Sequence, residues 1–144
     1  MARIRLDIPE GLPFVTEVTV RVGDLNYGNH LGNDALLGLL HEARLQFLAS
    51  LGWSEMDVGG QASIMADAAI VYKSQGRRGD RLRIEVGAGD LTGSGFDVLY
   101  RVSQADTGVL VALAKTALVL FDYAQGRPVR LSDDVRARLE GLSA

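Results

Sequence analysis

One long apolar helix constrains the fold of this chain more than any other feature. The apolar residues of this stretch are too dense for a single stripe; they are Leu36, Leu37, Leu39, Leu40, Ala43, Leu45, Phe47, Leu48 and Leu51. A helix that is apolar on nearly all sides is normally buried. Asn33 is in position to cap its start, Asp34 lies in the first turn, where the helix dipole favours negative charge, and Gly52 is a natural stop. The rest of the chain is therefore expected to wrap around this helix.

Alternating apolar and polar residues predict strands on both sides of the helix. The expected strands are Arg3–Ile8, Val18–Val22, Ala62–Lys73, Arg81–Ala88, Gly95–Gln104 and Val109–Asp122. The connections between the last four are short and rich in glycine, so we expect successive strands to pair as antiparallel hairpins. A turn at residues 126–128 and a short helix, capped by Ser132 and ending near Leu139, follow. The pattern predicts an α+β fold in which one antiparallel sheet curls around one long central helix.

Composition limits the classes of protein that the chain can belong to. With 144 residues, of which 47% are hydrophobic, it is expected to form one domain over residues 1–144. The net charge of −3 and the dispersed lysines and arginines argue against a nucleic-acid partner. No stretch approaches the roughly 20 apolar residues of a membrane span and cysteine is absent, so we expect a cytoplasmic protein. Because one sheet cannot enclose a helix this apolar, we also expect a homodimer or homotetramer.

The loop before the helix contains most of the polar residues that could take part in chemistry. They are Asp24, Asn26, Tyr27, Asn29, His30, Asn33 and Asp34, with Gly28 and Gly32 between them. Glycine permits backbone conformations that a side chain would forbid, so this loop is expected to have a defined shape. The backbone N–H groups at the start of the helix are available to polarise a carbonyl group.

The stretch Arg21–Arg44 resembles the signature of the hotdog-fold acyl-CoA thioesterases of the 4-hydroxybenzoyl-CoA thioesterase type. The matching positions are Arg21, Asp24, His30, Asn33, Glu42, Ala43 and Arg44, and residues 70–82 and 121–133 resemble later strands and the closing helix of that family. The resemblance implies a hotdog fold and hydrolysis of an acyl-CoA or acyl carrier protein thioester. It implies no cofactor besides the coenzyme A of the substrate. It also implies a catalytic aspartate where this chain has Asn26, and an amide cannot act as a general base.

Three interpretations follow from this replacement. In the first, which we rank highest, the chain is a thioester hydrolase whose base is Asp34. Asn26 and His30 then position the reacting groups, and backbone N–H groups near Asn33 hold the carbonyl oxygen. In the second, the chain is a catalytically silent hotdog protein that binds an acyl or aromatic ligand. In the third, it is a hydratase or dehydratase, although the helix motif of those enzymes is absent. Both residues also have a purely structural interpretation. Asp34 can be a negative charge that stabilises the first turn of the helix, and His30 can be a structural hydrogen-bonding residue.

Further residues are expected to bind the substrate or to support the site. The substrate-binding candidates are Asp24, Tyr27 and Gly28 in the loop and Lys73, Arg77 and Arg78 for the phosphates of coenzyme A. Asp24 also suits a role in bracing the loop backbone. The apolar floor of the pocket is expected to come from Tyr27, Leu37, Met65 and Ala69. Glu42 and Arg44 do not face each other on the helix, so each should find a partner elsewhere. The spacing of His30 and His41 matches no ligand motif, so we predict no metal site.

Overall fold

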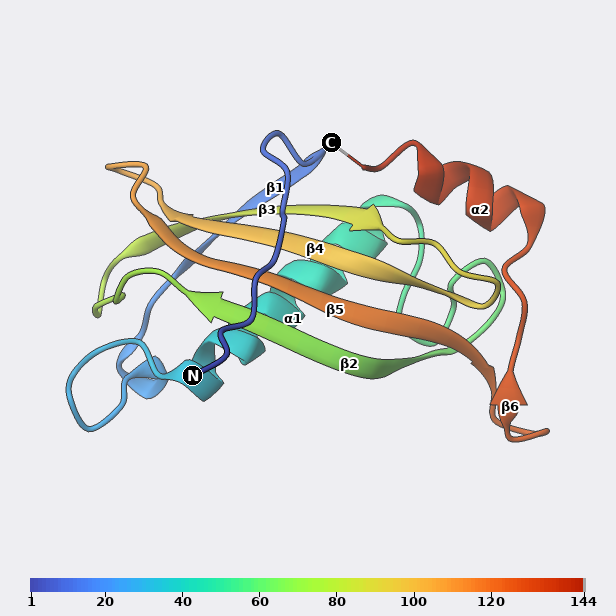
Figure 1. Ribbon diagram of the computed structural model, residues 1–144, viewed down its shortest axis with the longest axis horizontal. Helices are drawn as coiled ribbons and strands as arrows, with labels where there is room; N and C mark the ends of the chain where they lie inside the picture. Colours follow the sequence, from blue (N-terminus) through green and yellow to red (C-terminus); the bar gives the residue numbers. More distant parts are fainter. Residues whose placement is uncertain (144) are drawn as a thin grey trace.

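A computed structural model describes residues 1–143 and contains one antiparallel sheet with a long helix across one of its faces (Figure 1). The elements are β1 (Phe14–Thr19), the 3-10 turn η1 (Val22–Asp24), α1 (Asn33–Ser50), β2 (Ser63–Tyr72), β3 (Arg81–Gly89), β4 (Gly95–Gln104), β5 (Leu110–Asp122), β6 (Arg127–Pro128) and α2 (Asp133–Glu140). The strand order is β1-β3-β4-β5-β2, with the short β6 paired to β5. This arrangement is the hotdog fold, and it confirms the α+β prediction.

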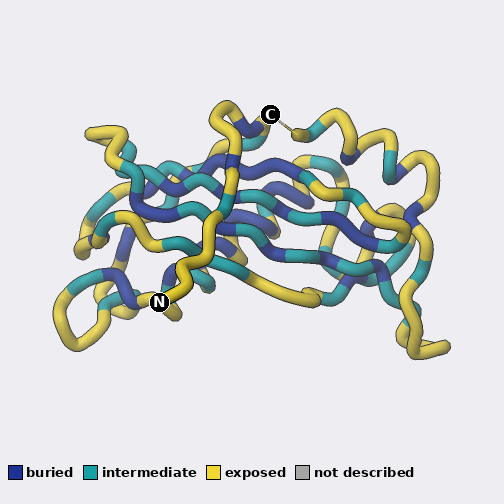
Figure 2. Tube along the Cα trace, in the orientation of Figure 1, coloured by how far each residue is buried: buried dark blue, intermediate teal, exposed yellow. Residues whose placement is uncertain are grey.

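The core lies between α1 and the inner face of the sheet. Leu40 and Leu48 of α1 are fully buried, and so are alternate residues of the middle strands such as Ile84 and Tyr100. Figure 2 shows the buried segments running along the centre of the sheet. Helix α2 begins at the predicted cap, where Ser132 Oγ accepts from the Val135 N–H at 3.2 Å. The packing of α1 against the sheet fixes the position of the first turn of the helix.

One side of α1 is exposed, which corrects the expectation that the helix is buried on nearly all sides. Gly38, His41 and Glu42 are exposed, and Leu45 retains 39% of its accessible surface. The single layer of strands covers only the side of the helix that faces it. The apolar residues beyond that side are left facing the free edge of β2 or solvent.

The strand pairing corrects the prediction of a hairpin between β2 and β3. β3 already has β1 and β4 as neighbours, so β2 pairs with β5 at the far edge, from Ser63 opposite Leu120 to Tyr72 opposite Ala112. The connection 73–80 must therefore cross from the edge strand β2 to β3, one strand in from the opposite edge, over the start of α1. It is held there by the Leu31 N–H, which donates to the Gly76 carbonyl at 2.8 Å. The other two predicted hairpins, β3–β4 and β4–β5, are confirmed.

The N-terminal segment also differs from the prediction. Residues 3–8 form no strand; they cross the outer face of the sheet, opposite α1 (Figure 1). Ile8 and Leu12 are buried there, and Arg101 Nη1 donates to the Ile8 carbonyl at 3.4 Å. The alternation in this segment reflects packing onto a sheet face rather than pairing within the sheet. The first strand runs from Phe14 to Thr19 instead of 18–22.

Candidate active site

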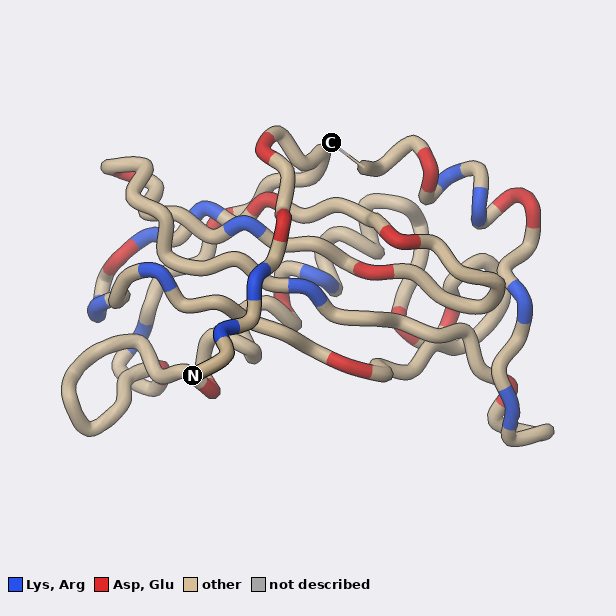
Figure 3. The backbone as a smooth tube through the Cα atoms, in the orientation of Figure 1, with Lys and Arg blue, Asp and Glu red and all other residues tan. Residues whose placement is uncertain are grey.

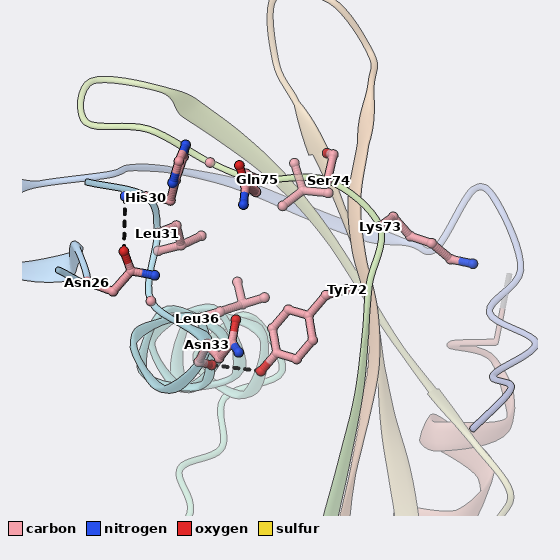
Figure 4. A pocket seen from close by; sticks show the side chains of 12 residues that line it. Asn26, His30, Leu31, Asn33, Leu36, Tyr72, Lys73, Ser74 and Gln75 are labelled. Atoms are coloured by element: carbon pink, nitrogen blue, oxygen red, sulfur yellow. Dashed lines mark hydrogen bonds between the residues drawn. The ribbon is translucent and has the colours of Figure 1, made fainter. Parts of the chain in front are cut away.

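The loop 25–31 is closed on itself by hydrogen bonds. The Asn26 N–H donates to the His30 carbonyl at 2.8 Å, and Asn26 Oδ1 accepts from the N–H groups of Gly28 at 2.9 Å and His30 at 3.2 Å. Asn29 at the tip adopts a left-handed conformation with φ 62°, which asparagine tolerates better than most residues. Because the side-chain oxygen of Asn26 is committed to the loop, its amide nitrogen remains as a donor, and Figure 4 shows this nitrogen turned toward a cavity.

That cavity, of about 260 Å³, separates the loop from the connection that follows β2. On one side lie Asn26, His30 and Leu31, and on the other Tyr72, Lys73, Ser74, Gln75 and Gly76 (Figure 4). Gly32, Asn33 and Leu36 of the helix start form its base. The crossing connection, which the hairpin prediction missed, thus supplies half of the cavity. Three of the four predicted catalytic residues, Asn26, His30 and Asn33, line it.

The start of α1 differs in detail from the prediction. The N-cap is Gly32 rather than Asn33, its backbone is extended with φ −65° and ψ 143°, and no side chain caps the helix. Asn33 is instead the first helical residue. The first N–H groups of an α-helix have no acceptor within the helix, so those of Asn33 and Asp34 are open to a ligand.

Asp34 lies in the first turn, as predicted, and its carboxylate folds back over Gly32. A Cβ atom at Gly32 would lie only 2.8 Å from Asp34 Oδ1, so a side chain at this position would displace the Asp34 carboxylate. Asp34 does not line the cavity; it lines a second depression, between α1 and β2.

Tyr72 is a site residue that the sequence analysis did not identify. It lies at the end of β2 and donates from its hydroxyl to the Asn33 carbonyl at 2.8 Å. Burial and the nearby Asp34 carboxylate raise the pKa of Tyr72, so the hydroxyl keeps its proton. The aromatic residue directly before Lys73 was the only indication in the sequence. Tyr72 lines the cavity but not the depression that Asp34 lines.

The second depression is a groove of about 390 Å³ between α1 and β2. It is lined by Asp34, Leu37, Gly38, His41, Arg44, Glu55, Ser63, Met65 and Leu118. Arg44 is 5% exposed and donates to Glu55 Oε1 at 2.9 Å and to the Tyr100 hydroxyl at 3.1 Å. These interactions give Arg44 the separate partner that was expected. Burial by itself would lower the pKa of Arg44. The interactions with Tyr100 and Glu55 outweigh burial and raise this pKa above its ordinary value, so the guanidinium remains charged.

Comparison with known proteins identifies the family. The sequence profile of the thioesterase-like superfamily matches residues 20–139. The chain belongs to this superfamily. No curated protein gives a significant match. A thioesterase from Thermus thermophilus, solved with coenzyme A and Zn, is 26% identical, with 94% of this chain and 98% of that chain covered and a TM-score of 0.80.

Two further solved structures have the same fold. The 1,4-dihydroxy-2-naphthoyl-CoA thioesterase of Synechocystis is 24% identical over 91% of this chain and 98% of its own, with a TM-score of 0.80. A probable thioesterase of Escherichia coli is 25% identical over 90% of this chain and 98% of its own, with a TM-score of 0.77.

The predicted substrate-binding residues of this thioesterase-like chain lie in different surroundings. Lys73 lines the cavity, whereas Arg77 and Arg78 are exposed farther along the same connection. Asp24 Oδ2 accepts from the Arg21 N–H at 2.8 Å, which fits its alternative role in bracing the loop. Tyr27 is fully exposed and does not form a pocket floor, and Gly28 lies beside it in the loop.

The expected apolar floor is only partly assembled. Leu37 and Met65 line the groove, but Ala69 pairs with Lys115 on the outer face of the sheet, away from α1. A β-bulge between Met65 and Asp67 reverses the alternation of β2, so Ala69 faces the other way.

Charges and metal-binding groups show no concentration in the described chain. Figure 3 shows cations and anions interspersed along the backbone. Within residues 1–143, no three His, Asp or Glu side chains are grouped to hold a metal ion, and neither helix is long and apolar enough to cross a membrane. The expectations of no metal and no nucleic-acid partner stay predictions.

Proposed function

We propose that this chain hydrolyses the thioester of an acyl-CoA or of an acyl carrier protein. The observation that carries the proposal is the position of the Asp34 carboxylate beside the uncapped start of α1, at one end of a partly apolar groove. Membership of the thioesterase-like superfamily supports the reaction type. The coenzyme A in the Thermus thermophilus relative supports coenzyme A as the carrier.

The proposed reaction begins with a water molecule beside Asp34. The carboxylate accepts a proton from this water as its oxygen attacks the thioester carbonyl. The N–H groups at the start of α1 stabilise the negative charge that develops on the carbonyl oxygen. The C–S bond then breaks, the acid is released, and the thiolate takes up a proton from His30 or from solvent.

The cavity would hold the thiol side of the substrate. The amide nitrogen of Asn26 is a donor there because its oxygen is bound to Gly28 and His30. Lys73 is the cation at the opposite wall, and Arg77 and Arg78 continue the positive charge along the connection. These three residues are proposed to attract the phosphates of the carrier.

We further propose that the chain forms a homodimer through β2. This edge strand is ten residues long and contains neither proline nor lysine; its one charged side chain, Asp67, pairs with Lys115 of β5, and its β-bulge lies between Met65 and Asp67. The other edge strand, β1, has six residues, follows Pro13 and carries Glu17. Native sheets usually protect long edges with such residues. Met65 and Tyr72 at the β2 edge retain 46% and 47% of their accessible surface, which a second copy would reduce.

A catalytically silent acyl-binding protein is the second candidate, and the amide at position 26 is the observation that favours it. The test measures thiol release from short, medium, long and aromatic acyl-CoA substrates. Asp34→Asn should lower kcat about 100-fold or more, the contribution expected of a general base. Glu42→Gln, the same chemical change at an exposed site on the same helix, should leave the rate unchanged. A folded Asp34→Asn variant with the full rate would exclude Asp34 as the base, and no thiol release from any substrate would favour the silent protein.

A further inference from the structure

We propose that the groove between α1 and β2 measures the length of the acyl group, with His41, Arg44 and Glu55 forming a polar end wall. The inference rests on the proposed hydrolysis, because it assigns the groove to the acyl part of that substrate. It predicts a preference for short and medium acyl groups over long ones.

The direction of the groove follows from the path of the chain. β2 runs back along α1, so its last residue, Tyr72, lies at the helix start, where it bonds to Asn33. Its first residue, Ser63, lies near the other end of the groove, where its hydroxyl donates to the Glu55 carbonyl at 2.7 Å. The groove thus leads from Asp34, beside the proposed reaction centre, toward Arg44 and Glu55.

The middle of the groove suits a hydrocarbon chain. Leu37, Met65 and Leu118 form its walls, and no atom lies within 4 Å of the Cβ position of Gly38. The absence of a side chain at Gly38 keeps the groove open one turn beyond Asp34. Each methylene placed here should strengthen transition-state binding about fourfold through burial.

The far end has the opposite character. Arg44 is tied to Glu55 and Tyr100, Tyr100 is 2.7 Å from Thr116 Oγ1, and His41 Nε2 lies 3.2 Å from Glu55 Oε1. A methylene that reached this network would displace its hydrogen bonds or leave charged groups without solvent or partners, and either outcome is unfavourable. The fixed network therefore acts as a stop.

The length of the groove sets the predicted limit. Asp34 and His41 are seven residues apart on one helix, which corresponds to about 10 Å at 1.5 Å per residue. An extended chain of about eight carbons, with zigzag single bonds near 1.5 Å, covers this distance. Longer acyl groups would have to bend out of the groove toward solvent.

The experiment measures kcat/KM for a series of saturated acyl-CoA substrates from acetyl to palmitoyl. For the wild type, the value should rise about fourfold per methylene to about eight carbons and then level off or fall. His41→Leu removes a polar group from the end wall without touching the bond between Arg44 and Glu55, so the optimum should move to longer chains. Gly38→Leu places a side chain in the middle of the groove, so the optimum should move to shorter chains.

Glu42→Leu is the matched control, because Glu42 is exposed beside His41 but lines the depression on the β1 side of the helix. It should not move the optimum. Hydrolysis with no dependence on chain length, or an optimum that neither groove variant moves, would overturn the inference and leave the proposed function intact. If no substrate is hydrolysed, the proposed function fails. Calorimetry then measures the affinity for the same acyl-CoA series, and the groove variants should shift the preferred chain length in the same directions if the inference holds.

Discussion

Replacing Asn26 by aspartate tests the assignment of roles at the site most sharply. Asparagine and aspartate have nearly the same shape, and a carboxylate oxygen can accept the two backbone N–H groups that Oδ1 now accepts, at 2.9 and 3.2 Å. The loop and the free energy of unfolding should therefore change little. What changes is the group that faces the cavity, because the amide N–H donor becomes a second carboxylate oxygen. If Asn26 donates to the developing charge on the substrate, the loss should be about 100-fold to 1,000-fold in kcat.

The assay is thiol release with the best substrate of the acyl-CoA panel, together with a thermal melt of each variant. Asn29→Asp is the control, since it adds the same charge three residues away at an exposed position whose left-handed backbone aspartate also tolerates. It should keep most of the activity. An Asn26→Asp variant as fast as the wild type, or faster, would refute the reasoning. The carboxylate implied by the family resemblance would then be the effective base, and Asn26 would be the reason for a lower native activity.

Three predictions on stability follow from the packing. Leu40→Ala, at a fully buried position, should lower the free energy of unfolding by about 2–5 kcal/mol, whereas Leu45→Ala on the exposed side of the same helix should lower it by about 0.5 kcal/mol or less in dilute protein. Urea unfolding measures both values, and equal losses would contradict the orientation of the helix. Gly59→Ala and Gly60→Ala should each lower the free energy of unfolding by about 1–2 kcal/mol, because both positions have a left-handed backbone. Gly59→Ala should cost about 1–3 kcal/mol more, because its Cβ would lie 2.3 Å from a methyl group of α2. Similar melting temperatures for the two variants would contradict this difference. Burial raises the pKa of Asp97, so the stability contributed by its protonated form is present below the ordinary aspartate pKa and is lost as the pH rises through the raised pKa. Asp97→Asn should therefore gain stability relative to the wild type between acid and neutral pH, as measured by urea unfolding. A difference in the free energy of unfolding that stays constant with pH would argue against this prediction.

Local patterns predicted strands β2 to β5 and both helices, because alternation and apolar density report directly on which side of an element is buried. They did not predict which strands become neighbours. The short connection after β2 suggested a hairpin, but β3 already had two partners, so β2 joined β5. The same limitation explains residues 3–8, since packing on a sheet face produces the same alternation as pairing within the sheet.

The candidate site was predictable where its residues are close in sequence. Asn26, His30 and Asn33 were found because they lie within one short loop and the helix start that follows it, and the structure brings them to one cavity. Tyr72 and Glu55 were missed because each reaches the site through the fold: Tyr72 bonds to a residue 39 positions earlier, and Glu55 to one 11 positions earlier. No spacing rule connects such residues until the path of the chain is known.

The groove lies between the exposed side of α1 and the edge strand β2. A second copy docked on β2 would therefore cover the groove as well as the edge, and the apolar density of the helix that first suggested a wrapping partner would be accounted for. Such a copy would also exclude water from the surroundings of Asp34, where charge interactions strengthen as solvent is removed. An acyl group lying in the groove would add apolar contact surface for the second copy, so binding of the acyl group beside Leu37 and Met65 and association of two chains would then favour each other. On this view, the apolar residues that exceed the needs of one chain's core serve the substrate and the second copy together.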